Sequence, residues 1–155
     1  MLVGPPGSGK STWIREFMNH KNEDEYVIVS SDDIIMELGK EKGLNYKEAF
    51  DKHAKQAMKV MKANAKQAFA DKKNIIWDQT NMSAKSRASK IQQAKGYSLK
   101  AVVWDLPREE LDRRLIKRDK EEDKSIPKAI VESMLSNFQM PTEEEGFDMV
   151  VVIKS

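Results

Sequence analysis

The sequence predicts an α/β fold of three layers, in which a parallel sheet of about five strands is flanked by helices. Two observations favour this class. Short apolar runs alternate along the chain with longer stretches of helical periodicity, and the runs lack the polar–apolar alternation of a half-exposed strand. Such alternation of strand and helix is typical of right-handed βαβ units. Because no repeat, low-complexity tract or Gly/Ser linker divides the chain, we expect a single domain over residues 1–155.

Val, Ile and Trp dominate the expected strands, which are Met1–Val3, Tyr26–Val29, Asn74–Trp77, Leu99–Trp104 and Met149–Ile153. Helical spacing of apolar residues predicts the helices Lys10–His20, Asp32–Lys40, Tyr46–Ala70, Ala84–Lys95, Arg108–Lys120 and Pro127–Asn137. Ligands of open parallel sheets bind beyond the carboxyl ends of the strands. The polar residues that directly follow each strand are therefore the candidates for function.

Composition narrows the class of protein. A hydrophobic fraction of 39% and a charged fraction of 34% are typical of a globular chain with a charged surface, and no apolar run approaches the roughly 20 residues of a membrane span. The absence of cysteine excludes thiol catalysis and disulfides. A net charge of +2 does not by itself indicate a nucleic-acid partner. We expect an intracellular, cytoplasmic protein with no membrane partner; composition does not predict its oligomeric state.

The most specific motif is a phosphate-binding loop. Residues 4–11 read Gly-Pro-Pro-Gly-Ser-Gly-Lys-Ser and match G-x-x-x-x-G-K-[ST] at every defined position of this P-loop pattern. Glycines let successive N–H groups point at phosphate oxygens, and the helix that begins near Lys10 adds its positive end. We expect Lys10 to reach the β- and γ-phosphates of ATP or GTP and Ser11 to ligate Mg²⁺. The other nucleotide-binding residues are expected to be Gly7, Ser8, Gly9 and Thr12.

Two carboxylates, Asp32 and Asp33, follow the second expected strand. A kinase needs a group that orients the acceptor hydroxyl and takes its proton as the oxygen attacks phosphorus, and Asp32 is the candidate for that general base. The alternative is that Ser31 or Asp32 caps the next helix. The two roles are compatible, and the position on the ligand side of the sheet favours catalysis.

Four polar residues, Asp78, Gln79, Thr80 and Asn81, follow the third expected strand. Asp78 has the position of a Walker-B-like acid and is expected to hold Mg²⁺ through water. Gln79, Thr80 and Asn81 are expected to bind the acceptor or to orient Asp32. The alternative is an ordinary turn that leads into the helix from Ala84.

A cluster of basic residues in the region Arg108–Lys124 predicts a lid over the triphosphate. Arg114 and Arg118 lie one turn apart and so share a helix face, and their guanidinium groups are expected to bind the nucleotide and to neutralise charge that develops during phosphoryl transfer. The alternative is a solvated helix face with ordinary ion pairs. A second basic stripe suggests either a track for polynucleotide phosphates or another solvated face. It consists of Lys52, Lys55, Lys59, Lys62 and Lys66.

Together these motifs resemble the polynucleotide 5′-hydroxyl kinase family. The resemblance is carried by GPPGSGKSTW, SSDD, DQTN, the arginine cluster and IPKAIVESMLSNFQMPTEEEGFD, and it covers nearly the whole chain. From Asn74 onward the chain also resembles the kinase-like domain of heterogeneous nuclear ribonucleoprotein U, through DQTNMSA, GYSLKAVV and the NF-x-MP…GFD ending.

The resemblance implies a P-loop NTPase/kinase fold that uses ATP or GTP with Mg²⁺ and phosphorylates the 5′-hydroxyl end of DNA or RNA during end repair. It implies the general base for Asp32, the phosphate lysine and metal hydroxyl for Lys10 and Ser11, and lid arginines for Arg114 and Arg118. The ribonucleoprotein domain lacks an acid at the position of Asp32, so this acid favours an enzyme.

The chain departs from the phage member of the family on the acceptor side. Ile35 stands where that enzyme has an arginine, and Asp78-Gln79 is offset from its Asp-Thr-Asn. No Asp-x-Asp-Gly-Thr motif occurs, so we expect no phosphatase module in these residues. Two other functions stay open: a small-molecule kinase for a nucleoside or sugar acid, and a non-catalytic RNA-binding P-loop module.

Overall fold

The computed structural model describes residues 1–154, in which five strands pair in parallel. β1 (Leu2–Val3) pairs with β4 (Lys100–Trp104), and β4 pairs with β5 (Met149–Ile153). β2 (Tyr26–Val29) pairs with β3 (Asn74–Trp77). The predicted α/β class with a parallel sheet flanked by helices is confirmed, although the strands form a group of three and a group of two.

The two groups of strands meet between β1 and β3. The backbone N–H of Gly4, just after β1, donates to the carbonyl oxygen of Thr80, just after β3, at 3.0 Å. The side-chain amide of Asn81 donates to the carbonyl oxygen of Leu2 at 2.8 Å. These bonds hold the loops that follow β1 and β3 side by side.

Helices separate the strands, as the periodicity predicts. Ser30 and Asn45 start two of them, each with a side-chain oxygen that accepts a backbone N–H of the first turn. Short 3-10 helices occur at Glu23–Glu25 and Glu143–Glu145, where none is predicted. The α-helices are α1 (Lys10–Met18), α2 (Ser31–Glu41), α3 (Tyr46–Ala70), α4 (Ala84–Gln93), α5 (Arg108–Glu122) and α6 (Lys128–Ser136).

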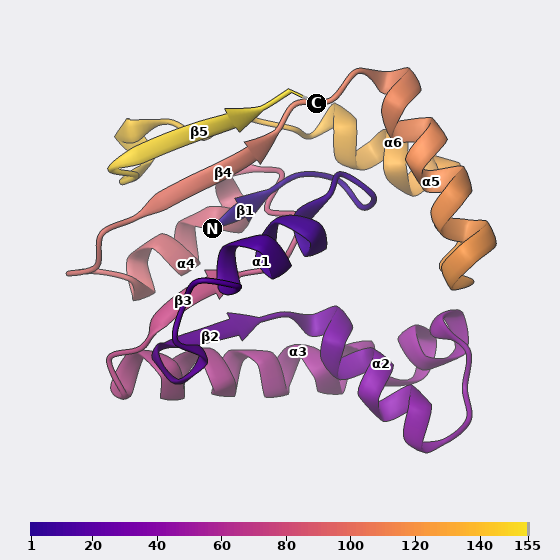
Figure 1. The fold of residues 1–155 in the computed structure, drawn as a ribbon, viewed down its shortest axis with the longest axis horizontal. Coiled ribbons are helices and arrows are strands. Elements are labelled where there is room, and N and C mark those ends of the chain that lie inside the picture. The colour runs from indigo at the N-terminus through magenta and orange to yellow at the C-terminus, as the bar shows by residue number, and fades with distance from the viewer. Residues whose placement is uncertain (155) are drawn as a thin grey trace.

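Apolar residues bury both faces of the central strands and so make three layers. On one face Ile14 of α1 packs with Leu2 and Val102. On the other face Phe147 packs with Val3, with Ile91 of α4 against them. The long helix α3 covers β2 and β3 through Met61 and Ala65, which pack with Val29 and Trp77. In Figure 1, α2 and α3 lie beside β2 and β3, while α5 and α6 lie beyond the carboxyl ends of β4 and β5.

The strand at one edge differs from the prediction of strands buried on both faces. β1 and β4 are buried as predicted apart from Lys100, but Met149, Val151 and Val152 of β5 are exposed. Ile28 of β2 is exposed as well, so β5 and β2, the outermost strands of the two groups, are less covered than β1 and β4. Among residues 1–154, no helix has both the length and the apolar character that crossing a membrane requires.

Candidate active site

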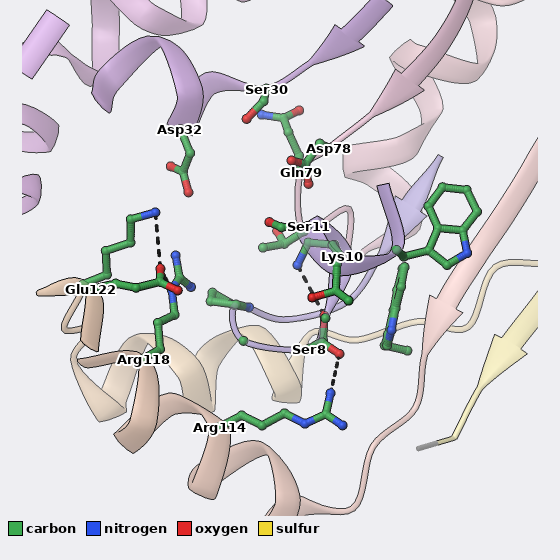
Figure 2. Close-up of a pocket in the computed structure, with 18 of the residues that line it drawn as sticks. Ser8, Lys10, Ser11, Ser30, Asp32, Asp78, Gln79, Arg114, Arg118 and Glu122 are labelled. Carbon is green, nitrogen blue, oxygen red and sulfur yellow. Dashed lines mark hydrogen bonds and ion pairs between the residues drawn. The ribbon is translucent and has the colours of Figure 1, made fainter. Parts of the chain in front are cut away.

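A cavity of about 770 Å³ lies at the carboxyl ends of the strands. It is bordered by the segments that follow β1, β2 and β3 and by α5, so it collects residues that are far apart in the sequence. Figure 2 shows Lys10, Ser11, Asp32, Asp78 and the arginines of α5 around this space. The position agrees with the rule that open α/β sheets bind ligands at this edge.

The P-loop wraps tightly at the base of the cavity, and its glycines are needed there. Gly7 and Gly9 have φ angles of +79° and +111°, in the left-handed region that favours glycine. At Gly4, a Cβ atom would lie 2.8 Å from the Ser8 Oγ, which is too close. Residues 4–9 therefore form a tight loop that leads directly into the first turn of α1. A phosphate would bind at the N-terminal end of α1, which carries the positive end of the helix dipole.

Lys10 lies within the loop that it is expected to serve. Its Nζ donates to the carbonyl oxygens of Gly4 and Pro5, at 2.9 Å each. Burial lowers the pKa of Lys10 to about 8; Asp78 opposes this shift, and Arg118 adds to it. The ammonium group is thus held by backbone carbonyl oxygens of the P-loop at the lining of the cavity.

Helix α5 packs against the P-loop, and two of its four arginines, Arg114 and Arg118, line the cavity. The Nη1 of Arg114 donates to the Ser8 carbonyl oxygen at 2.8 Å, and a Cβ on Gly7 would lie 3.1 Å from Leu115. Arg118 also lines the cavity and is only 18% exposed, with its Nε 3.6 Å from the Glu122 carboxylate. The Nε of Arg114 also pairs with the Glu110 carboxylate at 2.6 Å, so the ion pairs of the alternative interpretation are present as well, and the role of Arg114 and Arg118 at the triphosphate stays a prediction.

The part of the cavity that α2 and the end of β3 form is acidic, with Asp32, Asp33 and Asp78 in its lining. Asp32 lies in the first turn of α2, and the Ser30 Oγ, not Ser31 or Asp32, accepts the capping hydrogen bond, from the backbone N–H of Asp33 at 3.3 Å. The capping alternative for Asp32 is therefore wrong, and its carboxylate is available to the cavity. Burial and the charge of Asp32 raise the pKa of Asp33, whereas Lys124 lowers it.

The expected metal site consists of Ser11 and Asp78, which line the same cavity. Hydroxyl and carboxylate oxygens are ligands that Mg²⁺ accepts, together with water and phosphate. Burial raises the pKa of Asp78, Lys10 opposes this, and the charges of Asp33 and Asp32 add to it. Residues 1–154 hold no cluster of three or more His, Cys, Asp or Glu side chains that could chelate a metal alone. The residues fit an ion that is shared with the nucleotide.

The segment after β3 divides between the cavity and the interior. Gln79 and Thr80 line the cavity, and the Gln79 Nε2 lies 3.5 Å from the Ser31 Oγ. Asn81 does not join them, because it is 2% exposed and its amide donates to the carbonyl oxygens of Leu2 and Gln79. Its φ angle of +48° turns the chain toward α4. The structure gives Asn81 a place in the fold and does not bring it to the acceptor side.

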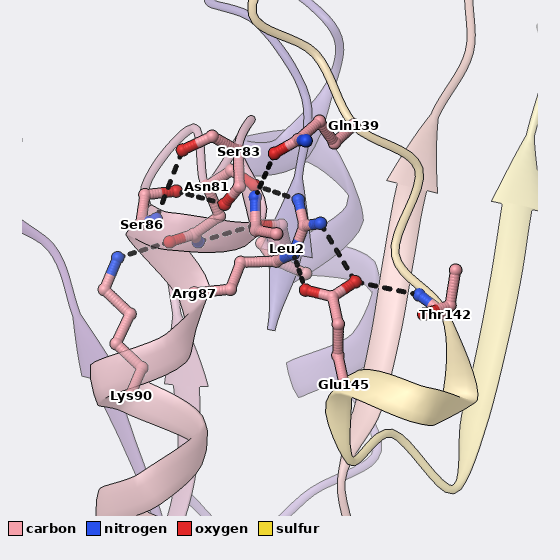
Figure 3. Close-up of polar contacts among 10 residues, drawn as sticks. Leu2, Asn81, Ser83, Ser86, Arg87, Lys90, Gln139, Thr142 and Glu145 are labelled. Carbon is pink, nitrogen blue, oxygen red and sulfur yellow. Dashed lines mark hydrogen bonds and ion pairs between the residues drawn. The ribbon is translucent and has the colours of Figure 1, made fainter.

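A buried ion pair between α4 and the 3-10 helix at Glu143–Glu145 stabilises the segment after β3. Arg87 of α4 is fully buried and donates to both carboxylate oxygens of Glu145, at 2.9 and 3.0 Å, and to the Asn81 carbonyl oxygen at 2.9 Å. Figure 3 shows these contacts together with Lys90, which also bonds the Asn81 side chain. The network joins α4, the loop after β3 and the 3-10 helix at Glu143–Glu145.

Sequence reasoning missed two contacts at the site, that of Tyr46 with Asp32 and that of Lys124, a residue of the predicted lid region, with Tyr46. The Tyr46 hydroxyl donates to the Asp32 Oδ1 at 3.0 Å, and Lys124 lines the cavity with its Nζ 5.7 Å from the centre of the Tyr46 ring. Tyr46 begins a helix that is readable from sequence, but the helix pattern does not say what its first residue contacts.

Comparison with known proteins agrees with this picture. The sequence model of a family described as AAA domain matches residues 1–141. Heterogeneous nuclear ribonucleoprotein U-like protein 2 of Mus musculus is 29% identical over 154 residues, and that of Homo sapiens is 28% identical. Each match covers 97% of this chain but 20% of the relative, so the chain spans about a fifth of the length of these relatives.

A solved structure shows the same fold. The crystal structure of a candidate kinase from Chloroflexus aurantiacus superposes with a TM-score of 0.72 over 99% of this chain and 82% of that chain, at 14% identity. The fold is thus that of a P-loop kinase-like domain. The resemblance to the ribonucleoprotein U domain is supported by the relatives, whereas polynucleotide specificity stays a prediction.

Proposed function

We propose that this chain, which belongs to the AAA domain family, is a polynucleotide 5′-hydroxyl kinase that transfers the γ-phosphate of ATP or GTP to the 5′-hydroxyl end of DNA or RNA. The observation that carries the proposal is the carboxylate of Asp32 in the same cavity as a complete P-loop. A binding module needs the loop but has no use for a base opposite it. Repair of nucleic-acid ends is the process that such an activity would serve.

On the donor side, the chain binds and neutralises the triphosphate. Backbone N–H groups of Gly7–Thr12 and the N-terminal end of α1 face the phosphates, and Lys10 bridges their oxygens. Arg114, which bonds the Ser8 carbonyl oxygen of the P-loop, and Arg118 stabilise the charge on the transferring group from α5. Bound Mg²⁺ supplies further charge neutralisation at the phosphates, and Ser11 and Asp78 are the residues that would hold it.

On the acceptor side, Asp32 orients the hydroxyl and takes its proton. The new bond joins the acceptor oxygen to the γ-phosphorus, the bond from that phosphorus to the nucleoside diphosphate breaks, and the proton stays on the Asp32 carboxylate until solvent removes it. Gln79 and Thr80 lie within the same cavity and contact the acceptor. Most of the rate enhancement comes from positioning and electrostatics.

The choice of a polynucleotide acceptor has support from two sources. The sequence motifs resemble polynucleotide kinases, and the relatives are named as ribonucleoproteins. A small-molecule kinase is the second candidate, and one observation favours it. The stripe formed by Lys52, Lys55, Lys59, Lys62 and Lys66 is exposed on α3 but does not line the cavity.

The test is transfer of γ-labelled phosphate from ATP or GTP to 5′-hydroxyl oligonucleotides of DNA and RNA, with a nucleoside and a sugar acid as rival acceptors. Because a general base contributes about 10²- to 10⁴-fold, Asp32→Asn should lower kcat by that factor and leave nucleotide affinity within about twofold. Asp33→Asn, the next carboxylate of the same turn, should lose less. If Asp32→Asn transfers phosphate at the undiminished rate, Asp32 is not the general base. Transfer to small alcohols alone would select the second candidate.

A further inference from the structure

We propose that Tyr46 is a positioning residue for Asp32, and that Lys124, at the end of the lid, holds the Tyr46 ring in place. The proposal rests on the proposed function, in which Asp32 is the general base. It adds a physical link between the two sides of the cavity, because the same lid also contacts the P-loop.

The first step is the hydrogen bond from the Tyr46 hydroxyl to the Asp32 Oδ1, at 3.0 Å. Burial raises the pKa of Tyr46 to about 12, and the charge of Asp32 and the hydrogen bond act in the same direction, so the phenol keeps its proton and remains the donor. Among residues 1–154 no other side chain donates a hydrogen bond to Asp32. With Oδ1 engaged, Oδ2 is the oxygen left for the acceptor hydroxyl.

The second step is the rigidity of the Tyr46 backbone. Tyr46 is the first residue of α3, directly after the cap Asn45. In this capping box the Asn45 side chain accepts from the backbone N–H of Glu48, and the backbone N–H of Asn45 donates to the Glu48 carboxylate. Helices α2 and α3 then pack very closely, since a Cβ on Gly39 would lie 2.5 Å from the Cβ of Ala49. The two helices that carry Tyr46 and Asp32 therefore have a fixed spacing, and the phenol is presented to the carboxylate at a set distance.

The third step is the contact with the lid. Lys124 follows α5 directly after Asp123, which ends the helix in a left-handed conformation with φ of +51°. Its Nζ lies 5.7 Å from the centre of the Tyr46 ring and 3.7 Å from the Glu122 carboxylate, and its side chain is 15% exposed. Distances near 6 Å are those of a cation–π contact.

These contacts connect the donor and acceptor sides through one element. Near its middle, α5 bonds the P-loop through Arg114 and the Ser8 carbonyl oxygen. At its end, the chain meets Tyr46 through Lys124. Figure 2 shows Arg118 and Glu122, between these points, facing Asp32 across the cavity. A lid that is seated on bound nucleotide thus also fixes the orientation of the base.

Tyr46→Phe tests the hydrogen bond alone, because the ring and its contact with Lys124 are kept. A hydrogen bond to a charged group accounts for about tenfold or more, so kcat for transfer should fall at least about tenfold. Nucleotide affinity and the KM for the acceptor should stay at the values of the natural sequence. The matched control is Tyr97→Phe, which removes a buried hydroxyl with no hydrogen-bond partner among residues 1–154 and should leave kcat unchanged.

Lys124 is tested by substitutions that keep or remove the cation. Lys124→Met should lower kcat about threefold, the size of one cation–π contact, and Lys124→Arg should restore most of it. In the Tyr46→Phe background, Lys124→Met should have no further effect, because the oriented bond is already gone. Lys21→Met, which removes the cation 5.1 Å from the Phe17 ring, is the control outside the cavity.

The outcomes distinguish failure of the positioning role of Tyr46 from failure of the proposed kinase function. If Asp32→Asn abolishes transfer while Tyr46→Phe transfers at the full rate, the base stands and the positioning role of Tyr46 is overturned. Additive losses in the double variant would keep Tyr46 and overturn the link to the lid. Full transfer by Asp32→Asn would remove the function itself, and the inference with it.

Discussion

Lys10 is the residue whose electrostatics should be visible in binding. Burial lowers its pKa to about 8, so at pH 7 the ammonium form prevails and near pH 9 the neutral amine prevails. Only the ammonium form is attracted to phosphate oxygens, and bound phosphates favour that form. Nucleotide affinity is therefore highest at pH values below the pKa of Lys10 in the free protein, and it falls as the pH rises through that pKa.

We therefore expect the Kd for ATP to be nearly constant from pH 6.8 to 7.3 and to rise toward tenfold per pH unit above pH 8. Titration calorimetry at pH 8 in buffers of different ionisation enthalpy should show proton uptake on binding. Lys10→Arg carries a charge that does not titrate in this range, so its affinity should be lower but flat with pH. An equally steep pH dependence in Lys10→Arg would assign the titration to another group.

At the scale of residues, the sequence predicts contacts between residues that are close along the chain and not contacts that depend on how helices pack. Lys10 and Ser11 sit in a contiguous motif whose geometry follows from its glycines, and the structure places both in the cavity. Tyr46 reaches Asp32 only because α2 and α3 pack together, and no local pattern encodes that contact. For Asn81, the sequence suggested a contact in the cavity that the structure does not contain. Its polarity suggested a ligand contact, but a buried turn uses the amide for backbone carbonyls.

At the scale of elements, prediction succeeded where apolar spacing was long and failed at the edges. Helix α3 has the predicted bounds, since 25 residues of helical periodicity leave little ambiguity. The exposure of β5 was not predictable from the sequence, because the composition of β5 resembles that of β4. Only the strand order shows that β5 lies at an edge. The 3-10 helix at Glu143–Glu145 also escaped prediction, although it provides Glu145 for the buried pair with Arg87.

Removing one partner of that pair should destabilise the fold far more than breaking a surface pair does. Glu145→Ala leaves the fully buried Arg87 guanidinium without its partner, so the free energy of unfolding should fall by about 3–5 kcal/mol in chemical denaturation. The Arg87→Met/Glu145→Ala double variant should lose less than the sum of the single losses. The control is Glu132→Ala, whose partner Arg108 is 37% exposed and whose loss should stay under about 1 kcal/mol. Equal losses in the two glutamate variants would contradict the structural role of Glu145.

At the scale of the whole molecule, the cavity joins two groups of strands that share few direct bonds. The P-loop and α5 belong to the side of β1, β4 and β5, whereas Asp32 and Asp78 follow β2 and β3. A nucleotide bound to the P-loop, with a metal ion shared between Ser11 and Asp78, would contact both groups at once. Ligand binding should therefore stabilise the complete fold and not the loop alone.

Thermal unfolding measures this directly. At ATP concentrations about 100-fold above Kd with Mg²⁺, the stabilisation should be about 2.7 kcal/mol, which corresponds to a rise in Tm of about 5–10 °C for a chain of this size. EDTA should reduce the rise, because the oxygens of Asp78 and the phosphates then repel each other without a shared cation. Ser11→Ala should reduce the rise in Mg²⁺ but should respond less to EDTA. A rise in Tm that EDTA leaves unchanged would mean that the nucleotide binds without the metal, and that Asp78 has another role.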